Sequence, residues 1–467
     1  MLSDEQRAGL ADASFDLLGR VGVRLTEPEA RGLLCGTGAE IDGDRVRMPL
    51  GLIDEAIRSA PSSVAIYGRE GERAMELGGR SVHFGAHTDA PDVLDPCSGK
   101  RRPCREVDVG RNAALIDALP NIAYTTASGM VADRPAEVAD RVALAQCLTH
   151  SAKPVLAMPV TYRSLVDCRE MAALAVGGDV ALRERPVLVV YAEPVSPLVH
   201  PDDSMRRLLY SAEHEIPLVY SGYAAMGGTA PMSAAAITVQ LCAESLSALV
   251  VHQLKNPGAP FIFGGMASVM DMQTTVFSYG APEFQRGNTL MAEMAHHFDL
   301  PNFGTAGTSD AQVFDGQAVL EAASSCMMAE LVGANLVHDV GLLGNATVVV
   351  PAMIVATDEM IAMLRHLVWG IDVSDETLAL EVLEAVGPGG EFVTHPHTFD
   401  HFRDVWYPNL LFRAGAEAWE ASQEEPFEQR VRAKACGLIE QHEPRCLPEE
   451  IAKAVQAVVT RAEALLA

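Results

Sequence analysis

Polar and aromatic side chains follow several short apolar runs of the chain. His87 and Asp89 follow the run at 82–84, Tyr223 follows the run at 217–220, and His338 lies in the run at 335–339. Residues that follow the strands of a parallel barrel face its active site, so we expect these side chains to share one pocket. Aromatic rings with a nearby carboxylate suit an organic cation.

The predicted pocket set comes from eight predicted strand ends, and four of those ends have Gly close by, which opens space for a ligand. The set is His87, Thr88, Asp89, Ser128, Met130, Met158, Glu193, Tyr220, Gly222, Tyr223, Met226, Gly264, Gly265, Met266, Thr308, Ser309, Asp310, His338, Asp339, Gly341 and Leu342. Neither a G-x-S-x-G nor an H-E-x-x-H motif occurs in the sequence. The set therefore favours binding and orientation of a ligand over hydrolysis.

A histidine cluster lies late in the chain, at His395, His397 and His401. It resembles a metal site, but the H-x-H of barrel metallohydrolases follows the first strand, and this one follows the last predicted barrel helix. We therefore expect no metal here. The alternatives are a lid and a set of ligands for a substrate carboxylate.

A dense basic patch occurs at Gly99–Pro103, between Cys97 and Cys104. We interpret it as a solvated hairpin turn, and the alternative is a contact with an anionic ligand or partner. The chain has nine cysteines, an odd number, and no C-x-x-C motif. This pattern predicts reduced thiols.

Short apolar segments alternate with amphipathic helical segments through the middle of the chain. The predicted strands are 82–84, 122–126, 154–158, 187–191, 217–220, 260–263, 302–305 and 335–339. The predicted helices that follow them are 106–119, 136–150, 162–176, 202–213, 232–255, 281–298, 315–332 and 352–369. Eight such units predict an α/β fold, a (β/α)8 TIM barrel. The competing doubly wound sheet is disfavoured because no G-x-G-x-x-G follows the first strand.

The barrel is predicted to span residues 76–373, with an N-terminal helical extension at 1–75 and a C-terminal helical segment at 374–467. The C-terminal helices are predicted at 375–386, 410–424, 426–440 and 448–467. The last of these carries an apolar stripe, which suits packing on the barrel wall or a subunit contact. We therefore expect a homo-oligomer.

The net charge of −27, from 62 acidic and 35 basic residues, excludes nucleic acid and anionic membranes as natural partners. No uninterrupted apolar run approaches the length of a membrane helix. The acidic N-terminus has no apolar core of a signal peptide, so we expect a cytoplasmic protein.

Four segments resemble the trimethylamine methyltransferase family, specifically its branch without pyrrolysine. They are HFGAHTDAPDVLDPCSGKRRPCREVDVGRNAALIDALPNI (83–122), GTAGTSDAQVFDGQAVLEAA (304–323), AELVGANLVHDVGLLGN (329–345) and EFVTHPHTFDHFRDVWYPNLLFR (391–413). The resemblance implies a barrel that docks a separate corrinoid protein and has no tightly bound cofactor of its own. It implies methyl transfer from an N-methylated amine to Co(I). The loop equivalent to the pyrrolysine loop is Gly341–Asn345, and its sequence favours a quaternary amine such as glycine betaine, proline betaine or carnitine.

Within this resemblance, predicted strand ends and neighbouring segments supply the candidate roles. The predicted cation cage is Tyr220, Tyr223 and Tyr279. The predicted polar contacts to substrate are His87, Asp89, His338, His395 and Arg403. The residues predicted to face the corrinoid are Gly264, Gly265, Gly307, Asp310, Gly341 and Leu342. Two alternatives remain open: a betaine-binding barrel without turnover, and a metal-dependent hydrolase.

Overall fold

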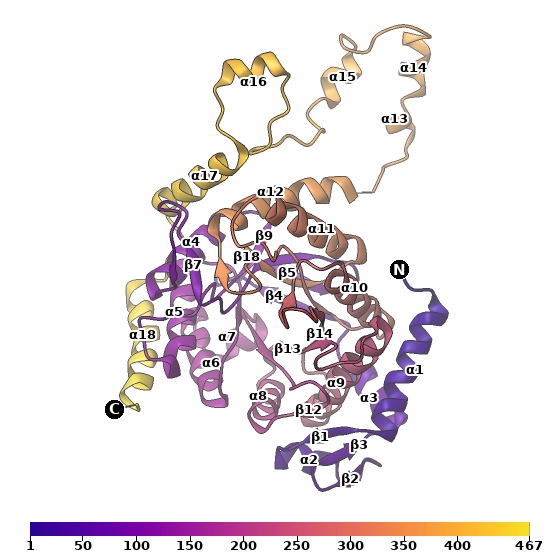
Figure 1. Cartoon of the computed structure of the whole chain (residues 1–467), viewed down its shortest axis with the longest axis vertical. Coiled ribbons are helices and arrows are strands. Elements are labelled where there is room, and N and C mark those ends of the chain that lie inside the picture. The colour runs from indigo at the N-terminus through magenta and orange to yellow at the C-terminus, as the bar shows by residue number, and fades with distance from the viewer. Residues whose placement is uncertain (369, 467) are drawn as a thin grey trace.

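The structure is a computed structural model that describes residues 1–368 and 370–466. Its centre is a barrel of eight parallel strands, which confirms the predicted fold (Figure 1). In chain order the barrel strands are β6 (His83–Ala86), β9 (Ile122–Thr126), β10 (Val155–Ala157), β11 (Leu188–Ala192), β13 (Leu218–Met226), β14 (Phe261–Met270), β16 (Phe303–Thr305) and β17 (Leu336–Val340). The barrel closes between β14 and β16, where Phe263 N–H donates to Pro301 O at 2.8 Å and Phe263 pairs with Asn302.

Helices surround the barrel as the alternation predicts. They are α4 (Glu106–Ala118), α5 (Ala139–His150), α6 (Tyr162–Val176), α8 (Asp202–Glu213), α9 (Ala234–Lys255), α10 (Pro282–His297), α11 (Gly316–Val332) and α12 (Pro351–Val368). Two short helices accompany them, η1 (Ala136–Val138) and α7 (Asp179–Glu184). The predicted end of the last helix at Trp369 lies outside the described residues. Helix α9 has the length and hydropathy of a membrane span, but most of it is buried against β13, β14 and α1 (Asp4–Arg20).

Two barrel strands are longer than predicted. The sequence predicts that these strands end at Tyr220 and Phe263, just before Gly222 and Gly264–Gly265, but β13 and β14 run on through the glycines and stay paired from Leu218–Phe261 to Met226–Val269. A Cβ on Gly222 would lie 2.4 Å from Glu244 Oε2, and one on Gly265 would lie 2.5 Å from Met291 Cε. Glycine at these positions therefore allows helices to approach the strands closely, and does not mark a turn.

The N-terminal segment is only partly helical, so the prediction of a helical extension is incomplete. Besides α1, α2 (Pro28–Leu34) and α3 (Leu50–Ser59), it contains β1 (Val23–Leu25), β2 (Glu40–Asp42), β3 (Arg45–Arg47), β4 (Ser63–Tyr67) and β5 (Arg73–Gly78). Strand β1 pairs with β12 (Val199–His200) from the barrel region. The β4–β5 hairpin packs Val64, Ile66 and Leu77 in one core cluster with the barrel interior residues Leu156 and Val219. The hairpin thus helps to fill the barrel interior, and the strand carboxyl ends form the mouth.

Two small hairpins border the barrel strands. Strands β7 (Asp92–Leu94) and β8 (Arg101–Pro103) form one, and β18 (Leu342–Leu343) and β19 (Val348–Val349) form the other. The two join because β19 pairs in parallel with β7. Strand β15 (Phe277–Ser278) pairs antiparallel with the outer end of β14.

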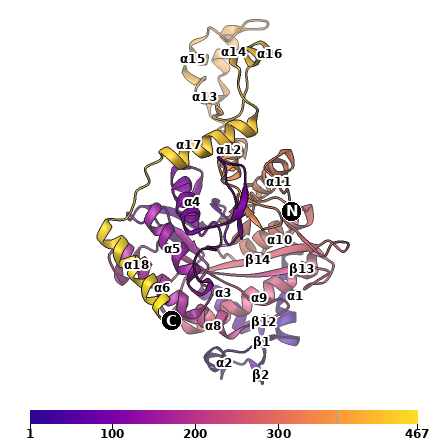
Figure 2. The ribbon, with the colours of Figure 1, turned by 60° about the vertical axis from the view of Figure 1, so that its left-hand side comes forward.

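The C-terminal segment begins with an arm, residues 370–426, which projects from the barrel body (Figures 1 and 2). It contains α13 (Asp375–Leu378), α14 (Leu380–Val386), α15 (Pro396–His401) and α16 (Ala416–Ser422). The predicted helix at 410–424 forms only in its second half. The chain then returns to the body as α17 (Phe427–Gln441) and α18 (Glu449–Ala464), which pack on α4 and α12, and on α5 and α6, respectively. The predicted end of α18 at Ala467 lies outside the described residues.

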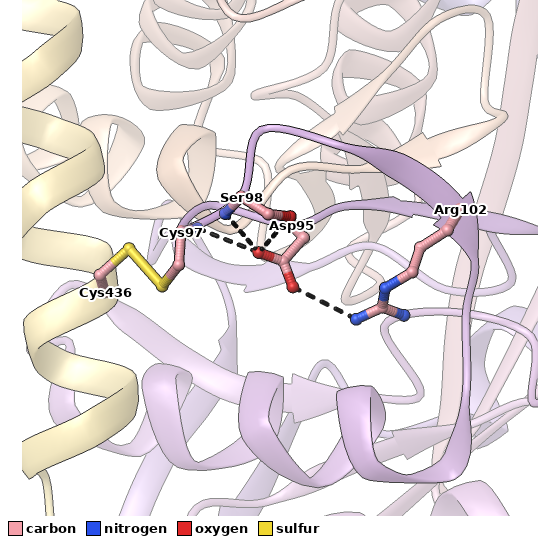
Figure 3. The surroundings of a disulfide bond; sticks show 5 residues. All are labelled: Asp95, Cys97, Ser98, Arg102 and Cys436. Carbon is pink, nitrogen blue, oxygen red and sulfur yellow. Dashed lines mark hydrogen bonds and ion pairs between the residues drawn. A yellow bond between two sulfur atoms is a disulfide. The ribbon is translucent and has the colours of Figure 1, made fainter.

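The basic hairpin is tied to the C-terminal segment by a disulfide, which corrects the prediction of reduced thiols at two positions. Cys97, in the turn between β7 and β8, bonds to Cys436 on α17 (Figure 3). Asp95 orders the same turn by accepting from Cys97 N–H at 3.1 Å and Ser98 N–H at 2.8 Å. The basic patch is locally neutralised, because Arg101 pairs with Asp92 and Arg102 pairs with Asp95 and Asp108. These pairings favour the hairpin interpretation over an anion site.

Candidate functional site: a carboxylate and tyrosine cavity at the barrel mouth

A cavity of about 460 Å³ lies at the carboxyl ends of the barrel strands. Its walls combine acidic, aromatic and methionine side chains. The lining residues are Thr88, Asp89, Met158, Tyr191, Glu193, Pro194, Val195, Ser196, Tyr223, Thr229, Met266, Tyr279, His338, Asp339, Leu342 and Ala346. The volume suits a small organic ligand.

Asp339 is the most constrained acid of the cavity. It lies in β17 with φ of +84°, in the left-handed region that non-glycine residues seldom adopt. Its Oδ1 lies 3.1 Å from His338 Nε2, and burial raises the pKa of its carboxyl, an effect that His338 partly offsets. This backbone conformation directs a buried acid to the cavity wall.

Asp89 and Glu193 are the other two acids of the wall. Asp89 also has a left-handed backbone, with φ of +64°, and it is exposed to solvent at the cavity. Loss of hydration of its carboxyl against the surrounding protein raises its pKa to about 7. Loss of hydration likewise raises the pKa of Glu193, while Arg207 lowers it in part. Glu193 Oε2 accepts a 3.0 Å hydrogen bond from the hydroxyl of Tyr191, which fixes its position.

An aromatic wall faces these acids. The rings of Tyr223 and Tyr279 are nearly parallel, 19° apart in orientation, with centroids 6.4 Å apart. Phe277 packs edge-on against Tyr223, and Phe284 packs edge-on against Tyr279. Parallel phenol faces beside carboxylates are the arrangement that binds quaternary ammonium ions in proteins.

Asp310 holds Tyr279 in place. Its carboxylate accepts from Tyr279 N–H at 2.8 Å, from Asn345 Nδ2 at 2.9 Å, and from the hydroxyl of Ser278. Glu321 in turn accepts from Asp310 N–H at 2.9 Å. The loop after β16 therefore positions an aromatic residue that precedes α10.

The structure brings four predicted substrate contacts together at this cavity: Tyr223, Tyr279, Asp89 and His338. Tyr220 points elsewhere, because it is fully buried and its hydroxyl lies 2.7 Å from His200 Nδ1. His87 is buried next to the cavity residue Thr88, and burial lowers the pKa of its ring to about 3. Among the described residues, its two ring nitrogens find no hydrogen-bond partner.

His395 and Arg403 lie on the arm, outside the cavity. His395 caps the start of α15 by accepting from His397 N–H at 3.1 Å, and Arg403 stacks over Phe402 with 5.1 Å between the guanidinium carbon and the ring centroid. In the part of the chain that the structure describes, no group of three or more His, Cys, Asp or Glu side chains is placed to hold a metal ion.

Of the six residues predicted to face the corrinoid, only Leu342 lines the cavity. Gly264 and Gly265 lie within β14, and a Cβ on Gly307 or Gly341 would meet Val340 or Ile354, at 2.9 Å and 2.3 Å respectively. Asp310 acts through the hydrogen bonds described above.

Three acidic or aromatic residues of the cavity, Tyr191, Glu193 and Asp339, are absent from the substrate contacts that the sequence predicts. Glu193 and Asp339 belong to the predicted strand-end set but carry no assigned role there. Tyr191 lies inside a predicted strand, and the alternation of strand side chains gives no sign that its ring extends to the mouth. The sequence signal for both acids is their place at an apolar strand, since Glu193 directly follows β11 and Asp339 stands near the end of β17.

Known proteins resemble this protein in fold, and in sequence over its whole length. The family model for trimethylamine methyltransferase (MTTB) matches residues 1–467. The chain belongs to this family of methyltransferases. It is 29% identical over 463 residues to trimethylamine methyltransferase MttB of Desulfitobacterium hafniense (strain DSM 10664 / DCB-2), covering 99% of the chain and 93% of that protein.

A second member of the family from the same species has a different substrate in its name. The chain is 27% identical to glycine betaine methyltransferase of Desulfitobacterium hafniense (strain Y51), over 99% of the chain and 96% of that protein. Among solved structures, monomethylamine methyltransferase (MtmB) of Methanosarcina barkeri matches with a TM-score of 0.54 and 12% identity, covering 95% of the chain and 88% of that structure. The chain is therefore a barrel methyltransferase of this family.

Proposed function

We propose that the chain transfers a methyl group from a quaternary amine to the cobalt of a corrinoid carried by a separate protein. The observation that carries this proposal is the cavity in which Tyr223 and Tyr279 face Asp89, Glu193 and Asp339. Tyrosine faces and carboxylates stabilise a permanent cation without needing a proton from it.

The residues of the cavity account for what the protein contributes to such a transfer. A quaternary ammonium leaves as a neutral amine, so no general acid is required. Tyr223, Tyr279 and the acids hold the cation, and Leu342, Met158 and Met266 shield it from water. Orientation and exclusion of water are the main sources of rate acceleration for a direct displacement. The corrinoid supplies a reduced cobalt nucleophile that accepts the methyl group.

The rim of the mouth suits a protein partner that carries the corrinoid. Exposed apolar side chains follow six of the barrel strands, on loops that a parallel barrel gathers at one end. They are Met130, Val160, Val195, Met232, Met272, Val276, Phe277 and Val313. Exposed apolar groups around a functional cavity favour a docking surface. Met130, Val195, Met272 and Phe277 would contact the partner and its cofactor.

A methyl-transfer assay tests the proposal. The protein is mixed with an active corrinoid protein in the Co(I) state and, separately, with each of a panel of quaternary amines, and the cobalt spectrum is followed. We expect a donor-dependent spectral change. If every donor fails although the corrinoid protein is active with another methyltransferase, the function is a different one. Binding of a donor without transfer would indicate a binding protein.

The docking surface is tested separately with Met272→Glu and its matched control Val180→Glu. Both residues are exposed, at 63% and 72%, but Val180 lies on α7, which precedes β11. We expect Met272→Glu to raise the KM for the corrinoid protein about ten-fold or more, because a buried charge weakens an apolar contact. Val180→Glu should leave that KM unchanged.

A further inference from the structure

The ionisable side chains that line the cavity are three acids, three tyrosines and one histidine. Asp89, Glu193 and Asp339 line it, and among its described lining residues there is no Lys or Arg. A second cavity of about 120 Å³ shares Asp89 and Met158 with the first, and its lining adds Asp140 but again no described Lys or Arg. A ligand group that carries negative charge therefore meets acids on both sides.

One guanidinium, that of Arg207, acts on the cavity acid Glu193 but is bound to other residues. Arg207 Nη1 donates to Pro159 O at 2.8 Å, and its Nε lies 3.2 Å from Asp203 Oδ2. Its charge lowers the pKa of Glu193, and Arg207 is not among the described lining residues of the cavity. Arg207 therefore stabilises the ionised wall and presents no donor to a ligand carboxylate.

The single histidine of the lining is also engaged. His338 Nε2 lies 3.1 Å from Asp339 Oδ1, and His338 Nδ1 lies 3.1 Å from Gly304 O. Both ring nitrogens thus have protein partners. The remaining polar atoms of the lining belong to hydroxyl groups of Thr88, Ser196, Thr229 and the three tyrosines, and to the backbone.

From this charge pattern we infer that the methyl donor is a quaternary ammonium without a carboxylate, with a hydroxyl, amide or alkyl tail in its place. The inference rests on the proposed function, since it concerns the donor of the same site. A hydroxyl or amide tail donates a hydrogen bond to Glu193 or Asp339. A carboxylate tail only accepts, and it would lie beside three acids, of which Asp89 and Glu193 are exposed to solvent and Asp339 is buried, so repulsion between like charges weakens its binding.

Calorimetry with a matched pair of ligands tests the inference. Glycine betaine and its carboxamide have nearly the same shape and differ by one negative charge, and choline provides the hydroxyl tail. We expect the carboxamide and choline to bind at least about ten-fold more tightly than glycine betaine, a difference of ~1.4 kcal/mol. Equal or tighter binding of glycine betaine overturns the inference.

Charge-removing variants locate the source of the discrimination. Glu193→Gln and Asp339→Asn each remove one charge from the cavity, and Glu184→Gln removes one from an exposed position on α7. We expect each cavity variant to reduce the preference for carboxamide over glycine betaine by about three-fold or more. The Glu184→Gln variant should keep the preference of the unmodified protein. A preference that is unchanged in both cavity variants contradicts the assignment.

Binding and turnover are read separately, so the two proposals fail in different ways. If the carboxamide and choline bind preferentially but no methyl transfer follows, the proposed function fails and the ligand assignment stands. If glycine betaine is both bound more tightly and demethylated faster than choline, the function stands and the ligand assignment fails.

Discussion

The barrel mouth and the arm both expose apolar side chains, but only the mouth is built on a core. The mouth loops extend from strands whose interior residues, such as Leu156 and Val219, are fully buried. On the arm, Leu410 is the single buried residue among the described positions 370–426. Its exposed large apolar residues are Ile371, Val373, Leu378, Leu380, Leu383, Phe392, Val393, Phe399, Phe402, Val405, Tyr407, Leu411, Phe412 and Trp419.

This difference in burial shows which part of the structure is stabilised by its own packing. Burial of apolar surface fixes the barrel, so a strained residue such as Asp339 is held in place by its surroundings. The arm has twelve acids, two bases and almost no buried contact, so its short helices gain little from packing. We expect chemistry at the mouth, and we expect that the arm contributes little to it.

The largest expected effect is the loss of one acid at the mouth. Asn tolerates the left-handed backbone of Asp339, so Asp339→Asn removes the charge with little strain. We expect kcat/KM for the amine to fall about 100-fold, equivalent to ~2.7 kcal/mol, because the cation loses a buried counter-charge. Steady-state kinetics with the corrinoid protein measures it.

Asp299→Asn is the matched control, since Asp299 also has a left-handed backbone, with φ of +52°, and is exposed at the end of α10. Its kcat/KM should stay within about two-fold of that of the unmodified protein. Equal losses in the two variants would mean that the charge at the mouth has no special role.

A smaller effect is expected from the aromatic wall. Tyr279→Ala removes one of the two parallel ring faces, and a cation–π contact in a desolvated site contributes about 1–2 kcal/mol. We expect a 5- to 30-fold rise in the KM for the amine. Tyr279→Phe keeps the ring and should stay within about two-fold. Tyr407→Ala, on the arm and 80% exposed, is the control for loss of a tyrosine.

The sequence predicts the barrel well because short apolar segments and amphipathic helices alternate regularly. Strands β9 and β11 and helices α6 and α8 fall within a residue of their predicted bounds. It predicts the ends of β13 and β14 poorly, since Gly222, Gly264 and Gly265 in the sequence suggest that these strands stop earlier than they do. The close approach of α9 and α10 explains Gly222 and Gly265, and the close approach of Ser221 on β13 explains Gly264.

The site was predicted in part, and the misses have a common cause. Residues at or shortly after strand ends, such as Asp89 and Asp339, do line the cavity. Some residues to which the sequence analysis gave a substrate role do not line the cavity. The hydroxyl of Tyr220 contacts His200, and His395 lies on the arm. The side to which a strand residue points depends on register and strand length, which composition does not reveal. Formation of a homo-oligomer stays a prediction.

Asp89 links function to stability through its titration. Its pKa rises from 3.8 to about 7, through loss of hydration and through the negative charges of Asp140, Glu193 and Asp339. A raised carboxyl pKa stabilises the folded state fully below pH 3.8, and this contribution is lost as the pH rises through about 7. Asn cannot ionise, so Asp89→Asn should be more stable than the unmodified protein at pH 8.

A shift of this size corresponds to roughly 4 kcal/mol, which we halve to ~2 kcal/mol because Asp89 borders an open cavity. Thermal unfolding at pH 8 should show a midpoint about 2 °C higher for Asp89→Asn. At pH 5 the two proteins should differ much less. In the unmodified protein the KM for the amine should fall as the pH rises through 7, and this dependence should weaken in the variant. A variant that is less stable at pH 8 contradicts the assignment of the pKa.

The smallest effect is expected from substitutions on the arm. It tests whether the arm contributes to the chemistry at the barrel mouth. His395→Ala with Arg403→Ala removes two residues that the sequence placed at the substrate, but the structure places both outside the cavity. We expect kcat/KM to change by less than about two-fold, because neither side chain contacts the lining and surface substitutions cost little. A loss as large as that of Asp339→Asn would mean that the arm reaches a mouth during turnover, either its own or that of a second copy. Sedimentation of the unmodified and double-variant proteins separates these cases, since only an arm that acts on a second copy makes the loss depend on self-association.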